Sequence, residues 1–400
     1  MKNIKLPDGW RYIKIRELTD VITGGTPSTK KNEYWENGNI PWLPSGECQD
    51  SEIRTASKFI TEEGLKNSSA KLMPINTVVI ALTGATTGKV GILRIEASAN
   101  QSVTGIIPND EFISKYVFYY LRSIRKKILH DSYGGAQKHI SQRYVKDLEV
   151  LLPPLETQKK IVEVLEKAEE VIEKRKETIR LLDELVKSRF IEMFGEEDYP
   201  IVKTEDICEY ITKGTTPKTN EIITEYSRGL VPYLKVYNLS FDGSMLFEEK
   251  PQYVSEETHN KLLSRSKVFP NDVLMNIVGP PLGKFAIVPN TYNEWNINQA
   301  IAIFRATDKI NPLYLLYALK QPNVLRPFID SAVGIRQQNL SLLQCRNLQI
   351  PLPPIEIQNQ FADFVNQIDK LKFEMEKSLK ELENNFNSLM QKAFKGELFN

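Results

Sequence analysis

The stretch VLLPPLETQKKIVEVLEKAEE at residues 150–170 returns as IPLPPIEIQNQFADFVNQIDK at residues 350–370. Two prolines, a glutamate and a glutamine recur with unchanged spacing: Pro153, Pro154, Glu156 and Gln158 reappear as Pro353, Pro354, Glu356 and Gln358. The shift is half of the 400-residue chain and does not drift along the stretch. This pattern indicates an internal duplication, which limits the possible folds to those built from two similar halves.

Other segments match in the same order, while the stretches between them differ. The matching pairs are DVITGGTPS (20–28) with EYITKGTTPK (209–218), IPWL (40–43) with VPYL (231–234), NTVVIALTGATTGKVGIL (76–93) with NDVLMNIVGPPLGKFAIV (271–288), ANQSV (99–103) with INQAI (297–301), and GGAQKHIS (134–141) with GIRQQNLS (334–341). A shared framework with divergent loops predicts one scaffold that presents two different binding surfaces.

The composition is that of an ordinary globular protein, 41% hydrophobic and 26% charged. No run of 18 apolar residues predicts a membrane span, and MKNIKLPDGWRYIKI lacks the apolar region of a signal peptide. Cys48, Cys208 and Cys345 are too far apart to suggest a zinc pattern or a disulfide framework, and three scattered histidines argue against a His-based metal site. We therefore expect a reducing, cytoplasmic location.

The net charge of +1 is unevenly distributed along the chain. Residues 1–154 carry 21 Lys and Arg against 16 Asp and Glu, whereas residues 155–198 carry 9 against 13. The mildly basic globular parts permit binding to a polyanion but do not require it, since ordinary surface charge explains the excess equally well.

Each half begins with mixed secondary structure. VVIAL, VGIL and VTGIIP are rich in β-branched residues and bounded by Gly and Pro, which predicts short strands. KYVFYYLRSIRKKILHD (115–131) predicts a helix. NPLYLLYALKQP (311–322) takes its place in the second half, with Asn311 as N-cap and Pro312 at the first helical position.

After each Pro-Pro pair, apolar residues recur at alternating spacings of four and three. The two series are Ile161, Leu165, Ala168, Ile172, Arg175, Ile179, Leu182, Val186, Arg189, Met193 and Phe361, Val365, Ile368, Lys372, Met375, Leu379, Leu382, Phe386, Leu389, Ala393. They predict two coiled-coil helices, each roughly 50 Å long at 1.5 Å per residue. Arg175, Arg189 and Lys372 interrupt the seams, either to fix the register or to mark a partner's docking site.

A single amphipathic helix of this length cannot bury its seam alone, so the two helices are expected to pair. We predict an α+β fold in which two homologous mixed α/β domains are separated by two long α-helices that form an antiparallel coiled coil, with pseudo-twofold symmetry. The predicted segments are head 1 (1–154), a first spacer helix (155–198), head 2 (199–354) and a second spacer helix (355–400). The alternative is that each helix packs on its own head.

Catalytic motifs are missing from the sequence. GATTGKVG (84–91) fails as a phosphate-binding loop because only three residues separate Gly84 from Gly88 and Val90 stands where Ser or Thr is required, so we predict a tight turn between strands. NPLY (311–314) lacks the second proline of the adenine-gripping N-P-P-Y motif, so we interpret it as a helix cap. These absences favour a binding protein over an enzyme.

Taken together, GGTPS, the TG-x-x-TGK-x-G turn, NQS, GGAQK-x-IS and the LPP-x-E-x-Q entry to a long helix closely resemble the specificity subunit of type I restriction–modification systems. The resemblance covers nearly the whole chain. The second half departs from the pattern, because GGTPS becomes GTTPK, GGAQK becomes GIRQQ and the TGK turn becomes GPPLGK.

The resemblance implies that each head is a target recognition domain for one half of a split double-stranded DNA sequence. The helices would be spacers that recruit two modification subunits, which hold S-adenosylmethionine and methylate adenine at N6. Restriction subunits, which use ATP and Mg, would join outside this core, and this chain would have no catalysis of its own. Helices of roughly 50 Å would limit the half-site separation to about fifteen base pairs.

Polar side chains and lysines in the repeated motifs are the expected DNA contacts. The candidates are Thr26, Ser28, Lys30, Lys31, Tyr34, Lys89, Gln137 and Lys138 in head 1, and Thr216, Lys218, Lys284, Arg336 and Gln337 in head 2. Tyr34 and Trp35 are expected to pack on sugar or thymine methyl groups, with solvated surface or turn residues as the alternative throughout. Gly24, Gly25, Gly84 and Gly88 are expected to serve turn geometry, and Asn100–Gln101 and Asn298–Gln299 a structural role.

Two other functions stay open at this point. A coiled-coil scaffold that bridges partner proteins without binding DNA is the first alternative, and sequence-specific binding by the assembled complex separates it from the recognition subunit. A fused methyltransferase or nuclease is the second, and methyl transfer by this chain alone would establish it.

Overall fold

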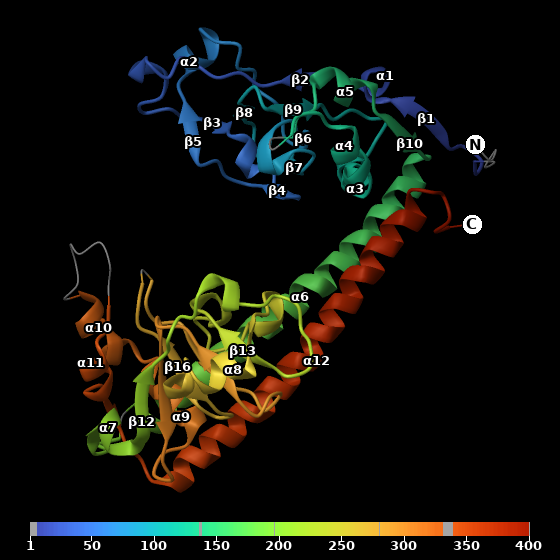
Figure 1. Cartoon of the computed structure of the whole chain (residues 1–400). Coiled ribbons are helices and arrows are strands. Elements are labelled where there is room, and N and C mark those ends of the chain that lie inside the picture. The colour runs from blue at the N-terminus through green and yellow to red at the C-terminus, as the bar shows by residue number, and fades with distance from the viewer. Residues whose placement is uncertain (1–5, 136–137, 196, 280, 331–338, 400) are drawn as a thin grey trace. The chain divides into compact units, whose positions relative to one another are not determined.

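The structure is a computed structural model that describes residues 6–135, 138–195, 197–279, 281–330 and 339–399 (Figure 1). It divides into two compact units. Unit 1 comprises residues 1–178 and 375–400, and unit 2 comprises residues 179–374. Each unit therefore combines one of the predicted heads with part of both long helices.

The globular part of unit 1 is built from short strands and short helices. Its strands are β1 (Arg11–Lys14), β2 (Val21–Thr23), β3 (Ile40–Leu43), β4 (Ser51–Ile53), β5 (Lys58–Ile60), β6 (Val78–Ala81), β7 (Val90–Leu93), β8 (Ser98–Ala99), β9 (Val103–Ile106) and β10 (Glu149–Leu152). Its helices are α1 (Ile15–Leu18), α2 (Glu62–Lys66), α3 (Ser114–Ser123), α4 (Arg125–Asp131) and α5 (Gln142–Asp147).

The main sheet of unit 1 has the order β2-β9-β6-β7-β4. Its first four strands are antiparallel to their neighbours, and β4 joins parallel to β7. A second sheet, β5-β3-β8, contains a parallel pair in which Trp42 lies opposite Ser98. β1 and β10 form a two-stranded ribbon. Strands β6, β7 and β9 fall where the β-branched runs predict them, because fully buried strands favour such side chains.

Unit 2 repeats this plan. Its strands are β11 (Ile201–Lys203), β12 (Cys208–Lys213), β13 (Leu230–Leu234), β14 (Tyr253–Ser255), β15 (Lys267–Val268), β16 (Val273–Asn276), β17 (Phe285–Ile287), β18 (Trp295–Ile297), β19 (Ile301–Ala306) and β20 (Gln349–Pro351). Its helices are α7 (Thr204–Ile207), α8 (Glu256–Asn260), α9 (Pro312–Leu319), α10 (Pro322–Asp330) and α11 (Leu342–Arg346).

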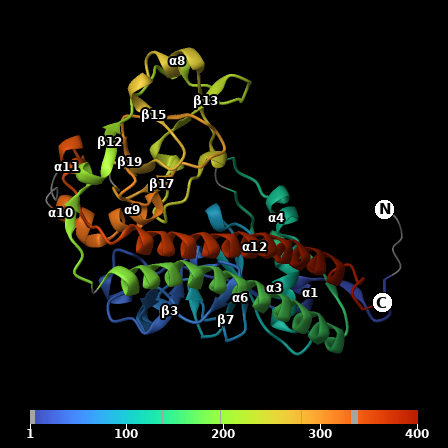
Figure 2. The ribbon, with the colours of Figure 1, turned by 90° about the horizontal axis from the view of Figure 1, so that it is seen from below.

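The sheets of unit 2 have the orders β12-β19-β16-β17 and β14-β13-β18-β15. The parallel pair recurs, with Tyr233 opposite Asn296 where unit 1 has Trp42 opposite Ser98. Figure 2 shows α9 beside β17, the main-sheet edge strand that it contacts. Matching strand orders and matching parallel pairs confirm that the two halves of the sequence encode the same fold.

One expected helix of head 1 is divided. The predicted helix over residues 115–131 is two helices, α3 and α4, separated at Ile124, whose φ of −95° and ψ of 7° depart from helical values. Ser123 donates its hydroxyl to the carbonyl of Tyr120 at 2.6 Å, a local bond of the kind that competes with helix continuation. In head 2 the expected cap is confirmed, because Asn311 accepts the N–H of Leu313 at 2.8 Å and Pro312 opens α9.

The two long helices are confirmed as α6 (Leu155–Phe194) and α12 (Ile355–Ala393). Their seam residues turn away from solvent. Those that are buried are Ile161, Leu165, Ile172, Leu182, Val186, Phe361, Val365, Ile368 and Phe386, and those that are partly buried are Ile179, Leu379 and Leu382. No helix among the described residues is both long enough and apolar enough to cross a membrane.

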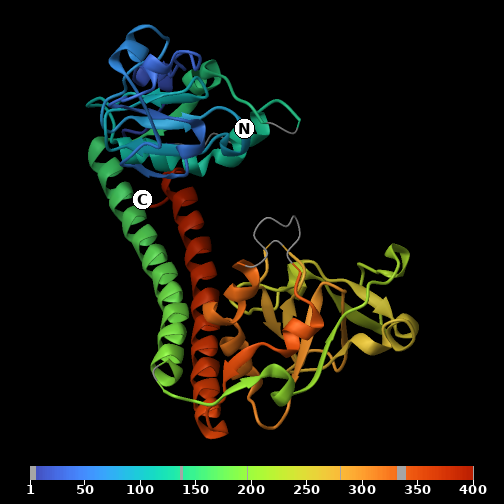
Figure 3. The same ribbon diagram turned by 90° about the vertical axis from the view of Figure 1, so that its left-hand side faces the viewer.

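Within each unit the two helices pair in antiparallel fashion (Figure 3). In unit 1, Lys176 of α6 pairs with Glu383 of α12 at 3.6 Å, while the first turns of α6 lie beside the end of α12. In unit 2, Lys372 pairs with Asp183 at 2.7 Å and Phe361 packs against Phe194. The ion pair of Lys372 supports the interpretation of this seam interruption as a device that fixes the register.

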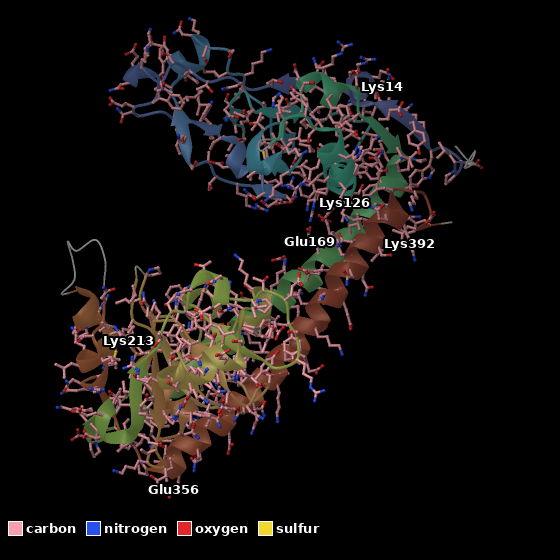
Figure 4. The ribbon with its side chains drawn as sticks, viewed as in Figure 1. Lys14, Lys126, Glu169, Lys213, Glu356 and Lys392 are labelled. Atoms are coloured by element: carbon pink, nitrogen blue, oxygen red, sulfur yellow. The ribbon has the colours of Figure 1, made fainter. Side chains whose placement is uncertain are left out.

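Each helix pair also packs on the head of its unit. In unit 1, Glu169 of α6, labelled in Figure 4, accepts bonds from the Tyr119 hydroxyl and from Arg122, both at 2.7 Å. In unit 2, Phe190 stacks on Tyr314 of α9 with ring centroids 5.8 Å apart. The helices therefore bury their seams against each other and against a head, which unites the two packing modes that the sequence left as alternatives.

An ion network ties β4, α3 and α6 together in unit 1. Glu52 accepts a bond from Arg94 at 2.6 Å and lies 3.1 Å from Lys115, which also pairs with Glu166 of α6. The bond from Arg94, with help from Lys115, lowers the pKa of Glu52 to about 2. A carboxylate whose pKa is depressed on folding stabilises the fold above its unfolded pKa, and this stabilisation is lost as the pH falls towards the folded value.

Replacing Glu52 with Gln is therefore expected to make unfolding less dependent on acid. At pH 7 the variant should be less stable than the parent chain, and the difference should shrink as the pH falls from about 4.5 towards 2. Urea unfolding at pH 7 and at pH 3 measures the difference in the free energy of unfolding between the variant and the parent chain at each pH. Glu62→Gln, at an exposed position of α2, is the control, and its difference in stability from the parent chain should be the same at both pH values.

Candidate nucleic-acid interface

The repeated motifs of head 1 meet at one end of its main sheet. β2 ends at Thr23, its antiparallel neighbour β9 begins at Val103, and the next strand, β6, ends at Ala81. Antiparallel neighbours place the end of one strand beside the start of the next. GGTPS, NQS and the TGK turn, which are far apart in the sequence, therefore emerge from the same end of the sheet.

Backbone hydrogen bonds join these loops. The Gly25 N–H donates to Ala99 at 2.8 Å, the Leu82 N–H to Ser102 at 2.7 Å, and the Ile140 N–H back to Leu82 at 2.9 Å. We call the described residues 24–31, 82–89, 100–102 and 138–140 loop cluster 1. All four repeated motifs contribute to it, which the sequence order alone does not reveal.

Unit 2 builds the same arrangement. The Gly214 N–H donates to Ile301 at 3.1 Å, the Ile277 N–H to Ala300 at 2.8 Å, and the Leu340 N–H to Ile277 at 2.9 Å. Loop cluster 2 comprises the described residues of 214–218, 277–284, 298–300 and 339–341. The protein therefore presents two loop clusters of equivalent construction, one in each unit.

Glycines allow these close approaches. A Cβ on Gly24 would lie 2.1 Å from the carbonyl oxygen of Ala99, and one on Gly214 would lie 2.1 Å from that of Asn298. Gly84 and Gly88, at φ +79° and +73°, adopt the left-handed conformation that the turn between β6 and β7 requires. The interpretation of Gly84 and Gly88 as turn residues is confirmed, whereas Gly24 is required for backbone approach.

Most of the expected contacts of head 1 lie at the surface of loop cluster 1. Ser28, Lys30, Lys31 and Lys138 are exposed, while Thr26 and Lys89 are partly buried. Lys89 donates to the side-chain oxygen of Gln49, so part of its hydrogen-bonding capacity is used within the protein. Gln137 lies outside the described residues.

Tyr34 is a correction to the sequence-based set. Its side chain is only 5% exposed, so its ring is core packing and offers no face to sugar or thymine methyl groups. Its hydroxyl accepts a bond from Lys31 Nζ at 2.9 Å, and this bond raises the pKa of Lys31. Trp35 packs edge-to-face on Trp42 and donates to the Ser28 carbonyl at 3.1 Å, which is also a structural role.

Aromatic donors hold the first loop of each cluster, residues 24–31 or 214–218, at the same point in both units. The indole N–H of Trp42 donates to the carbonyl of Gly25 at 2.9 Å, and the Tyr233 hydroxyl donates to that of Thr215 at 3.2 Å. Trp42 and Tyr233 are equivalent residues of IPWL and VPYL. Fixing a loop before binding reduces the entropy lost on binding, so both loop clusters are preorganised.

Trp42→Phe and Tyr233→Phe are expected to loosen these loops. Each change leaves a carbonyl without its donor, which should lower the free energy of unfolding by about 1–3 kcal/mol. Amide hydrogen exchange should accelerate in residues 24–28 or 214–218 of the changed unit only. Tyr226→Phe, at a 60% exposed ring, is the control, and equal exchange in all three variants would contradict the anchoring role.

In head 2, Thr216 and Lys218 are exposed members of loop cluster 2. Lys213, labelled in Figure 4, is an exposed cation at the end of β12 that the sequence analysis did not single out. Lys284 is partly buried, with its Nζ 5.6 Å from the centre of the Phe241 ring. Arg336 and Gln337 lie outside the described residues. Among the described residues, no group of three His, Cys, Asp or Glu side chains could hold a metal ion.

The chain resembles curated proteins, in one case over nearly its whole length and in another over about a third of it. It is 25% identical over 417 residues to the type I restriction enzyme MjaIX specificity subunit of Methanocaldococcus jannaschii, which covers 98% of this chain and 94% of that protein. It is 31% identical over 147 residues to the EcoR124I/EcoR124II specificity subunit of Escherichia coli, a match that covers 36% of each chain.

Solved structures share the fold. A chain from a structural study of complex assembly and conformational transition of the type I R-M system aligns with a TM-score of 0.65 and 20% identity, covering 98% of this chain and all of that one. The S subunit of a type I restriction–modification system from M. genitalium aligns with a TM-score of 0.54 and 17% identity over 98% of both chains.

A family model described as the type I restriction modification DNA specificity domain matches residues 7–181 and again residues 196–384. Each match covers one head with its loop cluster and most of the long helix that follows. Two matches that together span most of the chain agree with the duplicated fold, and this protein therefore belongs to the family of type I restriction–modification DNA specificity proteins.

Proposed function

We propose that each head reads one half of a bipartite, asymmetric double-stranded DNA target. One observation carries this proposal: the two loop clusters have the same backbone construction but present different side chains. Ser28 of loop cluster 1 is replaced by Lys218 in loop cluster 2, and the stretches that follow do not match. Base edges are distinguished by side-chain donors and acceptors, so two such surfaces suit two different half-sites.

We further propose that α6 and α12 recruit two modification subunits. The support is three exposed leucines on the helix pair of unit 2: Leu181, Leu185 and Leu371 are 48%, 46% and 44% exposed. The ion pair between Asp183 and Lys372 aligns the two helices so that the three leucines lie at a similar position along the helix pair. Exposed apolar side chains gathered on paired helices suit a protein partner.

Catalysis is assigned to the partners. S-adenosylmethionine would bind to the modification subunits, and ATP and Mg to the restriction subunits of the full complex. This chain, which lacks the sequence motifs of a methyl-donor loop, would act in the cytoplasm as the non-catalytic specificity subunit.

Co-expression with the modification subunit of the same system, in a host free of DNA methylation, tests the proposal. Single-molecule sequencing of the host genome is expected to show N6-methyladenine in a split, asymmetric motif with a fixed unspecified gap. A stable complex that methylates nothing would favour the scaffold function instead. Methylation by this chain alone would show that it is an enzyme.

A further inference from the structure

The Asn-Gln pairs that recur before β9 and β19 divide into two roles. Asn100 accepts the N–H of Ser102 at 3.0 Å, and Asn298 accepts that of Ala300 at 3.2 Å, so each asparagine closes its own turn. The side chains of Gln101 and Gln299, one residue later, are exposed. The structural role expected for the pair therefore belongs to the asparagine, and the glutamine is left at the surface.

Each glutamine lies against the threonine of the GGTPS or GTTPK segment. The Thr26 hydroxyl donates to Oε1 of Gln101. In unit 2 the backbone N–H of Gln299 donates to the Thr216 hydroxyl at 3.4 Å. We call Thr26 with Gln101, and Thr216 with Gln299, the Thr–Gln pairs. The two loops of each pair lie close together because Gly24 packs on the carbonyl oxygens of residues 99–100 and Gly214 on those of residues 297–298.

The Thr–Gln pairs have the same two residue types at equivalent positions in both units, whereas the neighbouring side chains of the loop clusters differ. The bond that joins them runs through the glutamine side chain in unit 1 and through the glutamine backbone N–H in unit 2. A residue that selects a base should differ between two heads that read different half-sites. A residue that holds the sugar–phosphate backbone should be the same in both, because the backbone is the same at every sequence. Neutral hydroxyl and amide groups are common donors to phosphate oxygens.

Exposed lysines lie in or next to both loop clusters. Lys30, Lys31 and Lys138 are exposed in loop cluster 1, and Lys213 and Lys218 are exposed at loop cluster 2. Lysines contribute attraction to phosphate without base selectivity, and neutral donors in the same cluster can fix the position of one phosphate group.

We infer that the Thr–Gln pairs are equivalent phosphate-positioning contacts that grip DNA at both half-sites irrespective of base sequence. This inference rests on the proposed DNA-reading function. It assigns Gln101 and Gln299 to the interface and separates them from the base-reading residues. Each glutamine presents its exposed side-chain amide N–H groups to the phosphate. The Thr26 hydroxyl holds the amide oxygen of Gln101, and the Thr216 hydroxyl holds the backbone of Gln299.

A charge series at the two glutamines tests the inference in the assembled complex with modification subunits. Gln101→Ala and Gln299→Ala should each weaken binding about tenfold, on cognate DNA and on DNA with scrambled half-sites alike. Glu, which has the same shape but repels phosphate, should weaken binding more than Ala does. Lys, which attracts phosphate, should restore binding to at least the parent level. The methylated motif should stay unchanged in every variant.

Gln360→Glu and Gln360→Lys place the same charges at an exposed position of α12 and should alter binding less than twofold. Gel filtration checks that each variant assembles with its partners. Unchanged affinity in all Gln101 and Gln299 variants would overturn the inference, as would a Lys variant as weak as Ala, which indicates a structural role. A changed methylation motif would make the glutamines base readers. If the parent complex itself methylates no split motif, the proposed function fails instead.

Discussion

Replacing Gln158 or Gln358 with Ala is expected to lower the free energy of unfolding by about 2–4 kcal/mol, because each glutamine makes two short hydrogen bonds and one long one to backbone groups and its removal leaves a small cavity. Gln158 is fully buried, accepts the N–H of Ile113 at 2.9 Å and donates to the carbonyl of Pro153 at 2.9 Å. Removing the amide leaves both backbone groups without these partners. Urea unfolding followed by circular dichroism measures the loss.

The repeat supplies a matched second test. Gln358 accepts the N–H of Asn311 at 2.9 Å and donates to Pro353 at 2.8 Å, so its replacement should cost the same amount in unit 2. Lys159→Ala and Gln360→Ala, at exposed neighbours, are the controls and should stay within about 0.5 kcal/mol of the parent chain. If a glutamine variant is as stable as its control, the buried glutamine does not stabilise the start of the long helix, and the repeated motif needs another explanation.

The double change Leu181→Glu with Leu185→Glu is expected to reduce affinity for the modification subunit by more than a hundredfold. Two carboxylates would have to be buried without partners in the apolar contact, and unpaired charges are costly to bury. The isolated chain should keep its melting temperature, since both side chains are nearly half exposed. Isothermal titration of the purified modification subunit measures the affinity, and the methylation level in cells gives a second readout.

Asn384→Glu with Ser388→Glu, which has the same four-residue spacing, is the charge control for this prediction. Both positions are exposed on α12 and polar in the parent chain. This variant should bind the modification subunit within a few-fold of the parent chain. If the leucine variant binds equally well, the partners dock elsewhere, and the exposed leucines of unit 2 need another explanation.

The long helices and the duplicated plan could be predicted because their signals are periodic and local. Spacings of four and three mark one face of a helix, and the same face is buried in α6 and α12. Asn311 and Pro312 predict the start of α9 for the same reason, since a cap acts within a single turn. The interruption at Ile124 was not predictable, because the serine bond that accompanies it is as compatible with a continuous helix as with a break.

The candidate interface was predictable only as a set of motifs. Ser28, Lys30 and Lys138 belong to one loop cluster because strands far apart in the sequence begin or stop at the same end of a sheet. Contacts between such distant segments produce no periodic pattern in the sequence. Tyr34 is a residue for which the predicted surface position is wrong. It occurs in a divergent polar stretch typical of a surface loop, yet its ring is buried, because packing on neighbours decides burial.

Repeats and helical periodicity are local properties of the chain, so a duplicated protein with two long amphipathic helices follows from the amino-acid order alone. The contacts between distant segments established three further features: each unit includes part of both helices, four scattered motifs form one loop cluster, and Asn100 closes a turn while Gln101 stays exposed. Burial and hydrogen bonding between distant segments depend on which surfaces meet, and no local pattern in the sequence specifies that.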